Sequence, residues 1–221
     1  MHGKRGQEGM KAGQILPQFR GRAVHDHWKS YQVFDQCTHG FCNAHHLREL
    51  QFVVDQYEQG WAEQMAKVLL DIKAEVETAA SEVMSLAPDR LSHWESVYDR
   101  VLRAGFKANP PPSAPVPVKR GRRKQSPPKN LLDRLEGHNG EVLAFMYDFR
   151  VPFDNNQAER DVRMIKVKQK VSGAFRTASG AGTFCRLRSY ISTVRKQGHN
   201  VIEALYNAFL GRPFIPTQGQ P

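Results

Sequence analysis

Glu159 and three cations that follow it are the group of side chains whose spacing points most directly to chemistry. In a helix, Glu159, Arg163, Lys166 and Lys170 share one stripe of the surface. One carboxylate at the head of a line of cations suits a helix that offers the carboxylate to a metal ion and the cations to phosphates. The spacing equally suits an exposed face on which Glu159 pairs with Arg163. The sequence leaves both interpretations open.

Asp26, between His25 and His27, is the second candidate. A short strand is predicted over residues 21–26, which places Asp26 at its carboxyl end. Carboxylates at strand ends are common metal and catalytic positions, because the strand holds the backbone rigidly. The alternative is an ordinary turn residue.

A compact run of metal-binding residue types follows: Cys37, His39, Cys42, His45 and His46. The spacing is shorter than that of standard zinc fingers. Zinc bound by Cys37, Cys42 and His45 is one interpretation, and a pair of buried thiols beside a helix start is the other. The third cysteine, Cys185, is predicted to lie in the core.

The remaining pattern is mainly helical. A second short strand is predicted over 38–43. Apolar residues at three- and four-residue steps predict helices from His45 to Gly60, over 61–86, from Pro88 onward, over 129–136 and 139–147, from 154 onward, and over 183–197 and 200–210. The glycine-rich segment 172–182 predicts a loop. On the helix that carries Glu159, the predicted core face consists of Ala158, Val162, Ile165 and Gln169.

The charge is concentrated in two places. The 221 residues carry a formal net charge of +10, of which +7 lies in residues 107–129 and +8 in residues 157–199, against small negative segments elsewhere. Residues 107–129 hold seven of the thirteen prolines and predict a solvated linker, whose KRGRRK cluster either contacts phosphate or only keeps the linker extended. No apolar run is long enough to span a bilayer, and three cysteines do not form a disulfide scaffold, so a reducing cytoplasm is expected.

Several strings resemble one family of transposases. VHDHWKSY, CNAHHLREL, FDNNQAERDVRMIKVKQKVSGAFRT and GTFCRLRSYISTVRKQGHNVIEAL are similar to segments of the insertion sequence 66 family. The resemblance covers nearly the whole chain in order, and the DNN-x-AER signature with its basic continuation is its most specific part. It implies a DDE-type DNA transposase, which cleaves and transfers DNA strands with the help of metal ions so that an insertion sequence can move.

The resemblance also implies a fold. It is an α+β, mainly helical structure with a partial ribonuclease-H-like core and a large helical insertion. Residues 1–45 are expected to supply core strands, 46–148 the insertion with the linker 107–129, 149–211 the C-terminal core helices and 212–221 a tail.

In such enzymes three acids hold two Mg²⁺ ions for in-line phosphoryl displacement. By resemblance, Asp26 is the second acid and Glu159 the third, and both are catalytic and metal-binding. The expected partner is double-stranded DNA, both transposon ends and target, bound by a homo-oligomer in the bacterial cytoplasm and nucleoid. DNA contacts are expected from Arg160, Arg163, Lys166, Lys168, Lys170 and Arg176.

One departure from the family concerns the first acid, which lies in an Asp-Glu-Thr context that this sequence does not contain. Residues 1–20 resemble the stretch before the second acid, so the chain is expected to be the C-terminal part of a transposase and inactive alone. Two other functions stay open, a non-enzymatic DNA-binding remnant and a zinc-stabilised helical interaction module.

Overall fold

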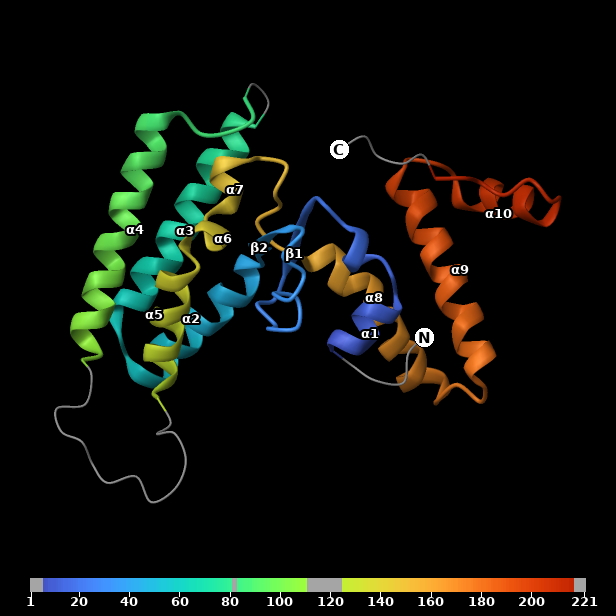
Figure 1. Cartoon of the computed structure of the whole chain (residues 1–221), viewed down its shortest axis with the longest axis horizontal. Coiled ribbons are helices and arrows are strands. Elements are labelled where there is room, and N and C mark those ends of the chain that lie inside the picture. Colours follow the sequence, from blue (N-terminus) through green and yellow to red (C-terminus); the bar gives the residue numbers. More distant parts are fainter. Residues whose placement is uncertain (1–5, 81–82, 111–124, 217–221) are drawn as a thin grey trace, which may run out of the picture. The chain divides into compact units, whose positions relative to one another are not determined.

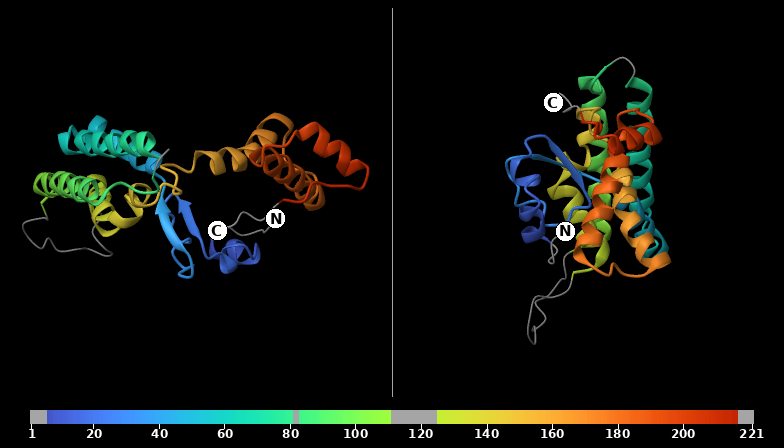
Figure 2. Two further views of the ribbon diagram at one scale, coloured as in Figure 1. Left: turned by 90° about the horizontal axis from the view of Figure 1, so that it is seen from above. Right: turned by 90° about the vertical axis from the view of Figure 1, so that its right-hand side faces the viewer.

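The computed structural model describes residues 6–80, 83–110 and 125–216 (Figure 1, Figure 2). The chain divides into two compact units. Pro17–Asn155 form one, which we call the bundle unit, and Met1–Leu16 with Asn156–Pro221 form the other, which we call the C-terminal unit. The described part is mainly helical with one small sheet, as predicted. Most of the predicted linker, residues 111–124, lies outside the described residues, as do residues 217–221 of the predicted tail.

The sheet of the bundle unit consists of two parallel strands, β1 (Arg22–His25) and β2 (Thr38–Phe41), which confirm the two predicted strands. His25 lies opposite Phe41 in the register. Because the strands are parallel, their carboxyl ends lie at one edge, where the next residue is Asp26 after β1 and Cys42 after β2.

Helices form the rest of the bundle unit. They are α2 (Asn43–Tyr57), α3 (Gly60–Ala79), α4 (Pro88–Ala108), α5 (Pro127–Gly137), α6 (Asn139–Val142) and α7 (Ala144–Tyr147). In Figure 1, α3 and α4 run side by side. The predicted apolar stripes form the core, with Leu50, Met65, Leu69, Ile72 and Tyr98 fully buried. Proline starts α4 and α5, where its missing N–H costs nothing.

Helix α3 ends earlier than predicted, at Ala79 instead of residue 86. The chain beyond it forms hydrogen bonds with a distant segment: the Leu86 N–H donates to the Met146 carbonyl, and the Phe149 N–H to the Met84 carbonyl. Met84 and Leu86 therefore use their backbone groups for tertiary contacts, and only Leu86 of the two is buried.

The C-terminal unit contains α1 (Gln7–Ala12), α8 (Asn156–Ser172), α9 (Ala178–Lys196) and α10 (Val201–Phe209). Helix α9 begins five residues before its predicted start at 183, so the predicted loop is wrong over 178–182. The Thr177 hydroxyl accepts a hydrogen bond from the Gly180 N–H at 3.0 Å, and this N-cap outweighs the low helix propensity of Gly180 and Gly182. Cys185, predicted in the core, is only half-buried.

The predicted core face of α8 is right only in part. Val162 and Ile165 lie on the side that meets α9, whereas Ala158 and Gln169 are exposed and no side chain of the helix is fully buried. Asp161 also takes part in this contact through its hydrogen bonds to α9. Apolar spacing did not predict that part of the contact because Asp161 is a charged residue.

Candidate metal and DNA site

Asp26 lies where it was predicted, directly after β1, and its side chain is exposed. Its Oδ1 accepts a hydrogen bond from the backbone N–H of Trp28 at 3.2 Å. This hydrogen bond stabilises the turn that follows β1. A carboxylate has about four lone-pair positions, so one such bond fixes its orientation and leaves it able to bind a cation.

A chain of hydrogen bonds defines the protonation of the imidazoles beside Asp26. The His27 backbone N–H donates to His25 Nδ1 at 3.2 Å, so neutral His25 carries its proton on Nε2. His25 Nε2 then donates to His39 Nδ1 at 3.0 Å, and His39 Nε2 donates to the Phe34 carbonyl at 3.3 Å. Burial and the nearby His39 lower the pKa of His25 to about 4.

His27 is also neutral at neutral pH. Burial is the main cause that lowers its pKa to about 4, and the Arg134 guanidinium adds to the effect. Both histidines that flank Asp26 are therefore uncharged under physiological conditions, so neither of them competes electrostatically with a cation bound at its carboxylate.

Four residues at the same edge of the sheet join the start of α2 to the C-terminal end of the bundle unit. Cys42 Sγ accepts a hydrogen bond from the Asn155 N–H at 3.2 Å, and the Asn43 N–H donates to the Phe153 carbonyl at 3.0 Å. We call Cys42, Asn43, Phe153 and Asn155 the clasp. It fixes the segment immediately before α8 beside the carboxyl end of β2. Sequence reasoning missed it, because no local pattern links residues 113 positions apart.

A polar network supports the clasp from inside. Asn43 is 1% exposed, and its Nδ2 donates to the Val142 carbonyl at 2.9 Å. Its Oδ1 is 3.0 Å from His46 Nδ1, which must therefore be the protonated ring nitrogen. Burial, followed by the charge of Arg134, lowers the pKa of His46 to about 3.

The proposed zinc ligands are not all brought together. Cys42 Sγ and a ring nitrogen of His45 lie within 4.8 Å of each other, whereas Cys37 shares no such group among the residues that the structure describes. Its thiol donates to the Phe34 carbonyl at 3.2 Å, and burial raises its pKa. A protonated thiol is a poor zinc ligand.

Glu159 lies in the first turn of α8 and is half-buried. A negative charge is favourable there, because the helix dipole is positive at this end. Across the helix, Asp161 accepts hydrogen bonds from Ser192 at 3.0 Å and Lys196 at 2.6 Å, and these contacts with α9 lower its pKa. At 100° per residue, the stripe that begins with Glu159 faces away from α9.

The predicted DNA-contact residues differ in their surroundings. Lys168 is half-buried: its ammonium donates to the Gly173 carbonyl at 3.0 Å and lies 4.2 Å from the centroid of the Phe175 ring. It therefore closes the turn that follows α8. The other five predicted cations are exposed, on α8 and on the loop before α9: Arg160, Arg163, Lys166, Lys170 and Arg176.

Comparison with known proteins identifies the family. The model of the Transposase IS66 family matches residues 1–183 of the 221-residue chain. The chain therefore belongs to this family of transposases, as the resemblance implied. Membership supports a role in transposition and implies DNA as the substrate. No curated protein and no solved structure matches the chain. In residues 6–80, 83–110 and 125–216, no helix is long and apolar enough to cross a membrane.

Proposed function

We propose that the chain provides two acids of a DDE-type transposase active site, Asp26 and Glu159, and that the exposed stripe of α8 binds the DNA backbone. The observation that carries the proposal is the clasp. It fixes the residue before α8 at the edge of the sheet where Asp26 lies, although the two acids are 133 positions apart.

Covalent geometry limits how far Glu159 can be from that edge. Glu159 is four residues beyond Asn155, and four residues span at most about 14 Å. The Asn155 N–H is hydrogen-bonded to Cys42, which directly follows β2. Asp26 directly follows β1, and paired strands such as β1 and β2 are about 4.8 Å apart. The clasp thus supports the placement of both acids in one site, within a ribonuclease-H-like core.

Mg²⁺ is the proposed ion because both proposed ligands are carboxylates, and Mg²⁺ prefers carboxylate oxygens and water to nitrogen or sulfur. Bound Mg²⁺ would supply Lewis acidity to the attacking and leaving oxygens of phosphoryl transfer. The chain's own part is to hold two carboxylates in reach of the scissile phosphate, to keep the flanking histidines neutral, and to position the DNA. Phosphates would lie along Arg163, Lys166 and Lys170.

Mn²⁺ binding, measured by calorimetry on the full chain, tests the two acids. We expect Asp26→Asn and Glu159→Gln each to weaken binding at least tenfold, because each removes a charged ligand. Asp35→Asn and Glu136→Gln are the matched controls, since both remove exposed acids of the bundle unit. Equal affinity in all four variants and the wild type would rule out the proposed pair.

A nicking assay tests activity. Only two of the three family acids lie within these 221 residues, so we propose that the polypeptide by itself binds DNA without cleaving it. Mg²⁺-dependent cleavage that Glu159→Gln abolishes would contradict this. The exposed cations favour a DNA-binding remnant as the second candidate function, and salt-dependent DNA binding without any effect of Asp26→Asn on Mn²⁺ affinity would favour it.

A further inference from the structure

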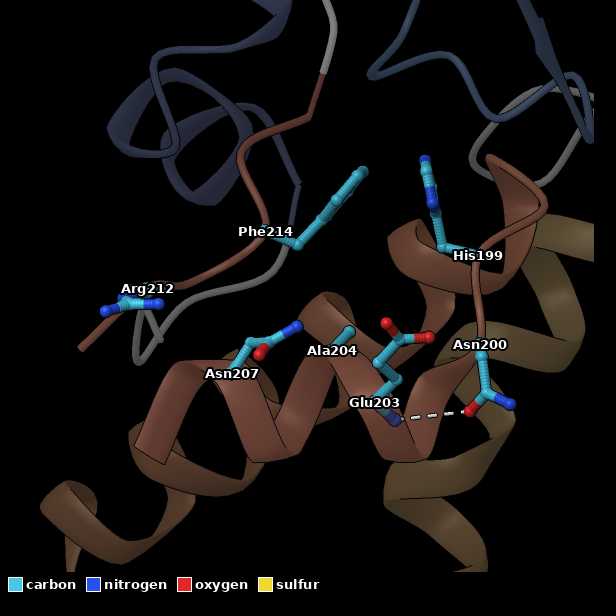
Figure 3. Close-up of a pocket in the computed structure, with 7 residues that line it drawn as sticks. All are labelled: His199, Asn200, Glu203, Ala204, Asn207, Arg212 and Phe214. Carbon is cyan, nitrogen blue, oxygen red and sulfur yellow. Dashed lines mark hydrogen bonds between the residues drawn. The ribbon is translucent and has the colours of Figure 1, made fainter. Parts of the chain in front are cut away.

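The C-terminal unit contains a polar pocket that the proposed site does not use. It has a volume of about 190 Å³ and lies between the start of α10 and the chain segment that follows that helix. Figure 3 shows the rings of His199 and Phe214 standing next to each other above Glu203. Asn200, Asn207 and Arg212 complete the polar lining.

The pocket is held by local hydrogen bonds. The Tyr190 hydroxyl accepts from the Phe214 N–H at 2.9 Å and donates to the Ala204 carbonyl at 3.1 Å, which ties the returning segment to α10. The Arg212 N–H donates to the Asn207 carbonyl at 2.9 Å. Gly211 has a φ of 77°, a left-handed conformation that favours glycine, and it turns the chain back over the helix.

The groups in the pocket are chemically varied for so small a volume. A carboxylate, two amides, a guanidinium and two aromatic rings line it, and the ring centroids of His199 and Phe214 are 4.7 Å apart. Glu203 accepts hydrogen bonds, Asn207 both donates and accepts, and Arg212 attracts an anion. A matching ligand is flat, offers hydrogen-bond donors and acceptors along one edge, and carries a negative charge.

We propose that this pocket binds a single unstacked nucleotide of DNA, an inference that rests on the proposed function as a DNA-binding protein. The base stacks on Phe214 with its edge toward Glu203 and Asn207, and the phosphate lies toward the end of the pocket where Arg212 is. Unpaired bases commonly stack on aromatic side chains. Because Glu203 only accepts, the pocket favours bases with an exocyclic amine, so cytosine and adenine bind better than thymine.

Titration of the full chain with mononucleotides, followed by NMR, tests the pocket without duplex DNA. We expect saturable shifts at Phe214 and His199 with dCMP and dAMP, weaker shifts with dTMP, and the weakest with deoxyribose 5-phosphate. Phe214→Leu should weaken dCMP binding about fivefold to a hundredfold, the range of base–aromatic stacking. Glu203→Gln should reduce the preference for dCMP over dTMP, because a glutamine amide can also donate.

Tyr206→Leu is the matched control, because it removes an exposed aromatic ring of α10 outside the pocket. Circular dichroism verifies that each variant is folded. Equal dCMP affinity in the wild type and Phe214→Leu, or shifts with deoxyribose 5-phosphate as strong as those with dCMP, would overturn the proposal. The latter result would identify a simple anion site.

Duplex probes separate this proposal from the proposed function. A duplex with one unpaired cytosine should bind more tightly than a fully paired duplex. Phe214→Leu should abolish this difference in affinity and leave binding of the fully paired duplex unchanged. If the wild type binds both equally, the pocket proposal fails while DNA binding stands. If it binds dCMP but neither duplex, the proposed α8 interface fails and the pocket stands.

Discussion

At the scale of single residues, Asn43 joins three separate groups beside the proposed site. Its backbone N–H holds Phe153, and its side chain joins the Val142 carbonyl to His46. The side chain bonds two groups that are buried away from water. Removing one partner of a buried hydrogen bond lowers the free energy of unfolding by more than the bond contributes, because the other group stays buried without a partner.

We therefore expect Asn43→Ala to lower the free energy of unfolding of the bundle unit by about 2–4 kcal/mol. Urea denaturation followed by tryptophan fluorescence measures it, since all three tryptophans lie in this unit. Asn130→Ala, an exposed change on α5, is the control and should cost under about 0.5 kcal/mol. A similar small loss for Asn43→Ala would show that the network contributes little.

At the scale of elements, α8 presents two opposite faces. One face meets α9 through Asp161, and the other carries Glu159 and its cations. If the exposed face follows the DNA backbone, each of its cations neutralises about one phosphate and releases counterions.

Arg163→Gln and Lys170→Gln should then each reduce the slope of log K against log salt by about 1, with similar effects on any DNA sequence. Fluorescence anisotropy with duplex DNA between low and moderate salt measures the slope. Lys67→Gln changes an exposed lysine of α3 that pairs with Asp71, and it should leave the slope unchanged. If both α8 variants have the same slope as the wild type, this face of α8 is not part of the DNA interface.

The sequence predicted the elements better than their ends and contacts. Apolar periodicity placed α2, α3 and α4 and their buried faces, because each of these helices covers a continuous core. It failed at the end of α3 and at the start of α9, where tertiary hydrogen bonds or a threonine cap outweighed helix propensity. On α8 the contact with α9 includes the charged residue Asp161, which a search for apolar periodicity cannot predict.

The site was predictable only in part. The position of Asp26 after a strand followed from local pattern, and the proposed role of Glu159 came from family resemblance. The clasp and the neutral histidine chain were not predictable, because both depend on contacts between segments that are far apart or on opposite strands. The hydrogen bond from the Asn155 N–H to the Cys42 sulfur, for example, follows from no spacing of residue types in the sequence.

At the scale of the whole molecule, titration should affect the two units differently. His25, His27 and His46 all belong to the bundle unit, and all three have pKa values lowered to about 3 or 4. The ordinary histidine pKa is about 6.5, so between about pH 6.5 and 4 the unfolded chain binds more protons than the folded unit. Stability of the bundle unit therefore falls as the pH is lowered through this range.

From pH 7 to pH 5, the buried His46 alone should lower the free energy of unfolding of the bundle unit by about 2 kcal/mol. Tryptophan fluorescence during urea denaturation at a series of pH values follows this loss. His46→Gln should flatten the pH dependence, whereas His93→Gln, an exposed change on α4, should not. A bundle unit equally stable at pH 7 and pH 5 would contradict the assigned neutral tautomers.

The clasp has a mechanical consequence for α8. Helix α8 has 17 residues and is about 25 Å long, and the clasp holds Asn155, the residue directly before its first turn. A rotation of roughly 10° about that end would displace the far end by about 4 Å, but Glu159 by less than about 1 Å. Under the proposed function, a change in the direction of α8 would therefore move Lys170 near the far end several times as far as Glu159 near the start.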